Sequence, residues 1–146
     1  MARWGNSKLK TQNSKLSILV LFLIVLSACG GNGLQPGYIA QQQTVEGFSF
    51  TLERPQEAEL LKDYELFVAI SDAAGAPADG ATVFLDMSMP AMHMPPQQPL
   101  ADALGGGRYR IQSLFTMEGD WDVLVHAVIA GKEYIATFDQ PVKLVQ

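Results

Sequence analysis

The sequence predicts an all-β protein that forms an antiparallel β-sandwich of about seven strands. Three observations support this fold class. Beyond residue 46, apolar and polar residues alternate in short runs, as they do in strands with one buried face. Turn residues such as Gly, Pro and Asp separate these runs at a spacing of roughly ten residues. No run keeps a helical period, so we expect no long helix.

The expected strands follow from this alternation in chain order. They cover residues 48–52, 64–71, 82–89, 100–104, 108–114, 121–128, 132–139 and 142–145. Turn residues lie between them at Gly75, Pro77 and Gly80, and again at residues 105–107. Gly131 is predicted to close a hairpin between two of the longest runs.

The first 28 residues are predicted to be a secretory signal peptide. Four basic residues precede an apolar run over residues 18–26, which is too short to span a bilayer. The sequence Leu-Ser-Ala-Cys follows and ends at Cys29, and it resembles the lipobox of bacterial lipoproteins. We therefore expect Cys29 to be diacylated and to anchor the chain on the extracytoplasmic side of a bacterial membrane, in the cell envelope. The alternatives are a plain signal peptide with a stray thiol and an uncleaved anchor helix.

Residues 29–46 are rich in Gly and Gln and are predicted to form a flexible tether. Residues 47–146 then form one domain of ordinary size. Loss of the signal peptide leaves six Lys or Arg residues against 15 Asp or Glu residues, a net charge of −9. This acidic balance excludes nucleic acid as a partner, because phosphate binding needs clustered cations.

Methionine and histidine gather at the end of the expected strand over residues 82–89. Five candidate metal ligands fall within eight positions, ahead of a Pro-Pro pair: Met87, Met89, Met92, His93 and Met94. Thioethers are soft donors that suit Cu(I), and they remain ligands where paired thiols would oxidise to disulfides. Because side chains alternate along a strand, Met87 and Met89 are expected on its inward face. The pattern predicts capture, storage or delivery of Cu(I), with an envelope protein as copper donor or acceptor.

Other readings of this region remain open. Met117 lies in an expected turn and is either a sixth copper ligand or a hydrophobic plug over the core. A metal-free interaction module, docking on an envelope protein through the Met-rich loop, is the alternative function. We expect no enzyme, because the chain has only two histidines and lacks the common hydrolase, metalloprotease and phosphate-loop motifs. His126, Asp120 and Asp122 are expected to be ordinary surface residues.

Four segments of the chain form a recognisable pattern. They are the turn at residues 72–77, the strand that ends in the Met run, the strand start at residues 105–110, and Phe-Thr-Met-Glu-Gly-Asp-Trp at residues 115–121. Together they resemble the YtkA-like domain, a relative of the FixH proteins of cytochrome oxidase assembly. The resemblance covers about residues 60–140. It implies an immunoglobulin-like sandwich of the envelope in which the Met/His loop carries copper, with Met117 beside it.

Overall fold

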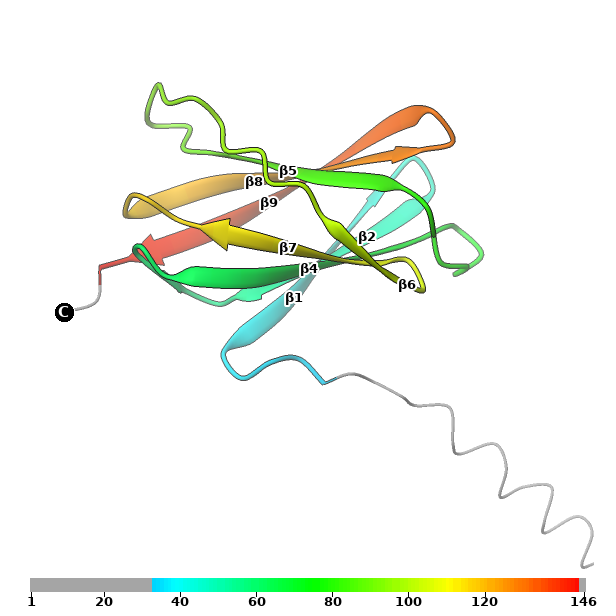
Figure 1. Cartoon of the computed structure of the whole chain (residues 1–146), viewed down its shortest axis with the longest axis horizontal. Coiled ribbons are helices and arrows are strands. Elements are labelled where there is room, and N and C mark those ends of the chain that lie inside the picture. Colours follow the sequence, from blue (N-terminus) through cyan, green and yellow to red (C-terminus); the bar gives the residue numbers. More distant parts are fainter. Residues whose placement is uncertain (1–32, 145–146) are drawn as a thin grey trace, which may run out of the picture. The chain divides into compact units, whose positions relative to one another are not determined.

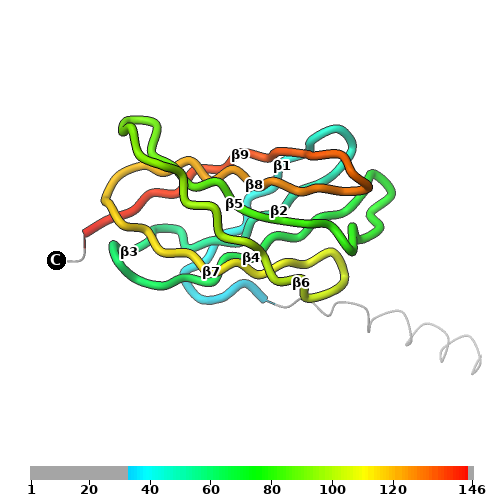
Figure 2. Tube along the Cα trace, turned by 45° about the horizontal axis from the view of Figure 1, so that its top comes forward, coloured from blue at the N-terminus to red at the C-terminus, as the bar shows by residue number. Residues whose placement is uncertain are grey.

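Nine strands form two β-sheets that pack face to face in the computed structural model, which describes residues 33–144 (Figure 1). The strands are β1 (Tyr38–Val45), β2 (Phe48–Pro55), β3 (Ala58–Glu59), β4 (Asp63–Ser71), β5 (Thr82–Ser88), β6 (Asp102–Gly105), β7 (Arg108–Leu114), β8 (Gly119–Ile129) and β9 (Lys132–Lys143). The first sheet has the order β1-β2-β4-β7-β6, and the second has the order β3-β9-β8-β5 (Figure 2). Neighbouring strands are antiparallel, except that the short β3 pairs parallel with β9. The predicted all-β sandwich is therefore confirmed.

The core lies between the two sheets and follows the predicted alternation. Along β8 the burial alternates residue by residue, with Trp121, Val123 and Val125 fully buried between half-exposed neighbours. The Trp121 ring meets the Phe115 ring edge-on, with 5.5 Å between ring centres, an arrangement that aromatic pairs favour beyond their burial alone. One face of each inner strand therefore holds the two sheets together.

Turn geometry fixes how successive strands meet. Ala130 and Gly131 both have positive φ angles, 49° and 82°, so a two-residue turn joins β8 to β9, and the predicted hairpin at Gly131 is confirmed. At the turn between β6 and β7, a Cβ atom on Gly107 would lie 2.4 Å from the backbone oxygen of Ile70. Only glycine allows the backbone to approach this closely.

The N-terminal boundary of the domain differs from the prediction. The predicted signal peptide and Cys29 lie outside the described residues. The sequence places the tether up to residue 46, but Tyr38–Val45 forms β1 and pairs with β2 along its whole length. Three consecutive glutamines made this segment resemble a linker, although it is an edge strand with little buried surface. Within residues 33–144, no helix is long and apolar enough to cross a membrane.

The C-terminal strand also differs from the prediction, which divides it into two. β9 runs without interruption from Lys132 to Lys143, through Pro141. The backbone N–H of Thr137 points away from β8, because it donates to the side chain of Gln43 on β1 at 2.7 Å. Pro141 lies four residues further on, so its missing N–H also faces away from β8. On that side β3 pairs only with Val142 and Lys143, so Pro141 takes no hydrogen bond from the ladder and the strand continues.

Candidate metal site

The candidate ligands lie on and beside a loop that extends β5. After β5 the chain turns back, and residues 97–101 run along the free edge of the same strand. Met87 and Gln97 exchange two backbone hydrogen bonds of 2.9 and 3.0 Å, which close the base of the loop. We call residues 90–96 the Met loop. In Figure 1 it projects beyond the strands at the upper left.

Two of the predicted ligands are core residues. Met87 is fully buried and Met89 is 6% exposed, and both continue the inward face that begins at Val83 and Leu85. Their inward orientation is as predicted from the alternation of the strand. The terminal methyl carbon of Met89 lies 2.8 Å from the position that a Cβ atom on Gly119 would occupy. Both side chains thus anchor the start of the Met loop by packing.

The three predicted ligands at the tip of the Met loop differ from these in exposure. Met92 is 49% exposed, His93 is exposed, and Met94 is partly buried against the core. Two backbone hydrogen bonds between residues close in sequence fold the tip. They run from the Met92 N–H to the Met89 carbonyl and from the Met94 N–H to the Met92 carbonyl, both at 3.1 Å. A compact turn therefore carries two thioethers and one imidazole on consecutive residues.

Met117 comes from a different part of the chain and lies in the turn before β8. Its side chain is partly buried against the same core, and its carbonyl accepts a hydrogen bond of 3.0 Å from the indole N–H of Trp121. The Gln97 amide donates to the neighbouring Thr116 hydroxyl at 3.4 Å. The contact between Met89 and Gly119 joins the same two segments. The turn with Met117 therefore lies next to the base of the Met loop, where Met89 and Gln97 flank it.

Two residues that shape the site, Gln97 and Gly119, were not predicted from the sequence to do so. Gln97 closes the base of the loop, but this role depends on long-range strand pairing that its residue type does not indicate. Gly119 has a φ of 124° and makes room for Met89. Its position two residues before the buried Trp121 was a usable signal, since glycine inside a strand often marks a close approach.

The donor set of the site is dominated by sulfur. Among residues 33–144, no group of three or more His, Cys, Asp or Glu side chains is arranged to hold a metal ion. Hard ions such as Mg²⁺ and Ca²⁺ need several oxygen ligands, which the Met loop does not offer. Thioethers with one imidazole suit Cu(I). The chemistry of the loop thus suits copper better than the hard divalent ions.

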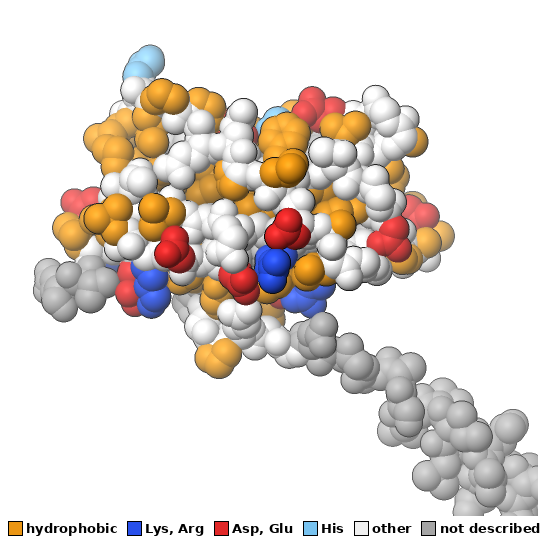
Figure 3. Space-filling view, viewed as in Figure 1, with side chains coloured by type: hydrophobic (Ala, Val, Ile, Leu, Met, Phe, Trp, Pro, Cys, Tyr) orange, Lys and Arg blue, Asp and Glu red, His pale blue; other side chains and the backbone are white. Residues whose placement is uncertain are grey.

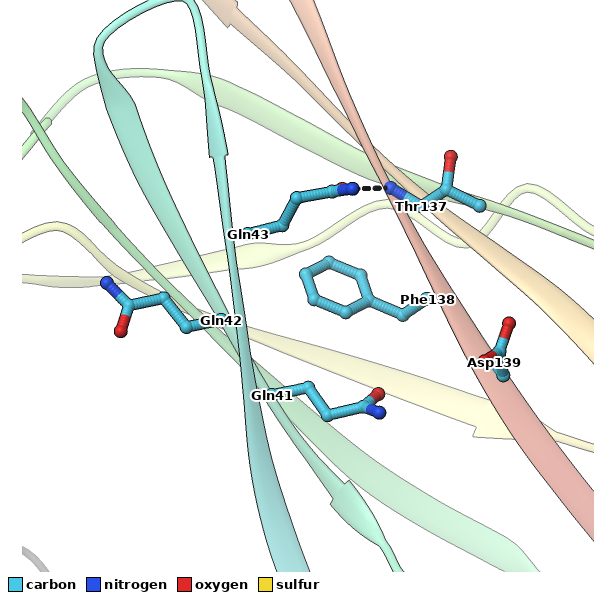
Figure 4. A pocket seen from close by; sticks show the side chains of 6 residues that line it. All are labelled: Gln41, Gln42, Gln43, Thr137, Phe138 and Asp139. Atoms are coloured by element: carbon cyan, nitrogen blue, oxygen red, sulfur yellow. Dashed lines mark hydrogen bonds between the residues drawn. The ribbon is translucent and has the colours of Figure 1, made fainter.

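A second, more polar feature lies between β1 and β9. A groove of about 230 Å³ is lined by Gln41, Gln42, Gln43, Thr137, Phe138 and Asp139 (Figure 4). Gln41, one of the lining residues, accepts two hydrogen bonds on its side-chain oxygen from the buried Arg54, at 3.0 and 3.1 Å. Burial lowers the pKa of Arg54, and the carboxylate of Asp139 acts in the opposite direction. None of the six predicted copper ligands lines this groove.

Comparison with known proteins gives one informative match. The family model described as YtkA-like matches residues 42–126, more than half of the chain. No curated protein matches. A solved structure of a proposed glycoside hydrolase from Bacteroides vulgatus aligns at 17% identity and a TM-score of 0.40, over 60% of this chain and 16% of that one. This chain thus spans less than a fifth of that protein, and the likeness carries no argument about activity.

Proposed function

The chain belongs to the YtkA-like family, and we propose that it is a lipid-anchored, extracytoplasmic protein that binds Cu(I) through its Met loop and exchanges it with envelope proteins. The observation that carries this proposal is the exposure pattern of the loop. Met92 and His93 are exposed, and Met94 is partly exposed beside them. An exposed methionine on a projecting loop gains little from packing, whereas a soft ligand needs this accessibility.

The structure favours a particular subset of the predicted ligands. Met92, His93 and Met94 form the proposed first three ligands, and Met117 supplies the fourth from the adjacent turn. Met89 is the second choice for the fourth position, because its buried side chain lies against the same turn. Met87 is fully buried, so in this proposal it supports the loop and does not bind copper.

Copper is the cargo of the proposed site. Thioether ligands need no deprotonation, so binding by this set depends weakly on pH compared with a thiolate site. The loop ligands are reached from solvent, which allows a partner to replace them one at a time. A Met-dominated set favours Cu(I) over Cu(II), so we propose no redox cycling and no enzymatic turnover.

Anaerobic titration of the mature chain with Cu(I), against a competing chelator, tests the proposal. Replacing Met92 and Met94 together by leucine should weaken binding by well over tenfold, since even changes outside the ligand shell cost about 10- to 100-fold. Met87→Leu is the matched control, because it also removes a thioether but lies in the core. Equal affinity of the double variant and the parent chain contradicts copper binding by the loop.

Membrane attachment is tested separately. The parent chain should incorporate a radiolabelled fatty acid and sediment with the membrane fraction, and replacement of Cys29 by serine should abolish the label. Copper binding by the purified Cys29→Ser chain should be unchanged. A parent chain that is membrane-bound but unlabelled points to an uncleaved anchor helix in place of a lipid.

A further inference from the structure

The outer face of the second sheet differs in charge from the rest of the domain. Side chains that point outward from β5, β8 and β9 include five carboxylates: Asp86, Asp120, Asp122, Glu133 and Asp139. Asp122 and Asp139 are directly opposite each other in the β8–β9 register. Like charges in this cross-strand position repel and destabilise a sheet. Folding alone therefore does not account for this arrangement.

The basic residues of the described chain neutralise this face only in part. Arg54 is buried, and the other five each pair with carboxylates elsewhere: Lys62 with Glu59, Arg108 with Glu53, Arg110 with Glu65 and Asp102, Lys132 with Glu46, and Lys143 with Glu57. None of the five outer carboxylates takes part in these pairs. In the view of Figure 3, Lys and Arg side chains appear only on the lower part of the molecule, on the side of the first sheet. Asp139 lies near the buried Arg54, and Glu133 lies beside His126. Asp86, Asp120 and Asp122 have no Lys or Arg partner among the described residues, so the outer face of the second sheet keeps an excess of negative charge.

An apolar row crosses the same face. The register places Leu100, Phe84, His126 and Ile135 side by side across four adjacent segments. Leu100 is 69% exposed and Ile135 is 42% exposed. The Phe84 and His126 rings stack with 4.6 Å between their centres. An exposed apolar row between carboxylates has the layout of a protein-binding surface, which has an apolar centre and a charged rim.

Two further details of the row concern His126. Its Nδ1 atom is 2.8 Å from a carboxylate oxygen of Glu133. Its Nε2 atom is buried and has no hydrogen-bond partner among the described residues. Since this atom is already covered within the domain, the contribution of His126 to the row is its ring, which stacks on Phe84.

We propose that the outer face of the second sheet is a docking surface for a protein whose own surface places Lys and Arg residues around an apolar centre. Charge complementarity selects this occupant. A second copy of this chain would bring five carboxylates against five, and an anionic membrane surface would be repelled in the same way. The Met loop begins at the end of β5, so a docked protein lies beside it. This proposal rests on the charges and the apolar row of the outer face, and it does not depend on copper binding.

Photocrosslinking in the cells that naturally produce the full chain tests this surface. A photoreactive residue replaces Leu100, and the control position is Leu104, which is 49% exposed on β6 in the other sheet. We expect crosslinking from position 100 and not from position 104. The crosslinked peptide of the partner should lie in a segment rich in Lys and Arg.

Charge variants then test whether the carboxylates carry the interaction. The triple variant Asp86→Asn, Asp120→Asn and Asp122→Asn should lower the crosslinking yield about tenfold. Each variant position removes one exposed charge pair with the partner, and the three small losses in affinity multiply. The control triple variant Asp63→Asn, Glu65→Gln and Asp102→Asn changes the net charge equally on the first-sheet side and should leave the yield unchanged. Circular dichroism checks that both variants fold.

Several outcomes overturn the proposal. They are the absence of a crosslink from position 100, a crosslink to a second copy of this chain or to lipid, and a crosslinked partner surface without basic residues. An equal effect of the two triple variants, or no effect of either, also overturns it. The copper titration described above is independent of all of these results, so failure of one proposal leaves the other standing.

Discussion

Gly119→Ala gives the sharpest test of how the Met loop is supported. Gly119 has a φ of 124°, which costs an L-amino acid about 1–3 kcal/mol. The new Cβ atom would also lie 2.8 Å from the Met89 terminal methyl carbon, so that side chain must leave its rotamer at a cost of about 0.5–1.5 kcal/mol. We expect a loss of about 2–3 kcal/mol in the free energy of unfolding. For a domain of this size, this corresponds to a drop in Tm of roughly 10 °C.

Urea unfolding followed by the fluorescence of Trp121 measures this loss. A double-mutant cycle with Met89→Leu separates its two causes, because leucine lacks the terminal methyl group that meets the new Cβ atom. In the Met89→Leu background, the cost of Gly119→Ala should fall by about 0.5–1.5 kcal/mol and leave the backbone strain. Gly131→Ala is the control, since it has positive φ but open space around its Cβ position. A change within about 0.5 kcal/mol for Gly119→Ala refutes the reasoning.

Three further predictions concern polar groups of the sandwich. Tyr109→Phe removes a hydroxyl that donates to a backbone carbonyl at 2.6 Å and accepts from a backbone N–H at 3.0 Å, so it should lower thermal stability by about 1–3 kcal/mol with no change in fold by circular dichroism. Asp122→Asn removes the repulsion with Asp139 and should stabilise the domain by about 0.5 kcal/mol in urea unfolding. Asp139→Asn should stabilise it less, because Asp139 also favours the charged form of the buried Arg54. Gln41→Ala leaves two guanidinium donors of Arg54 without their acceptor and should cost about 1.5–3 kcal/mol by the same assay, while Gln42→Ala on the exposed side of β1 should cost little.

The fold was predictable wherever one face of a strand is buried. β4, β5, β7 and β8 alternate residue by residue in burial, and the apolar pattern of the sequence reveals them directly. β1 was not predicted, because its residues are mostly half-exposed or exposed and its sequence has no apolar face to detect. The turn at Glu46 and Gly47 was the available signal, since a residue followed by glycine is typical of a two-residue hairpin.

The remaining differences between the predicted and the observed strands come from pairing between segments that are far apart in the sequence. β3 has only two residues, and it exists because Ala58 lies opposite Val142 of β9, far away in the chain. The edge pairing of residues 97–101 with β5 likewise depends on where the Met loop ends. The local sequence does not reveal these contacts, because the pairing partner of each segment is determined by how the whole sandwich packs.

The methionines of the candidate site also divide into positions that strand alternation explains and positions that it does not. Met87 and Met89 lie where the alternation of β5 demands an apolar side chain, so their identity gives no separate information about a ligand. Met92 lies beyond the last paired residues of β5, where packing makes no such demand and half of the side chain remains exposed. Methionine at that position has to be explained by something other than the core. The end of the inward face at Met89 therefore divides the methionines of this region, and only those beyond it argue for copper.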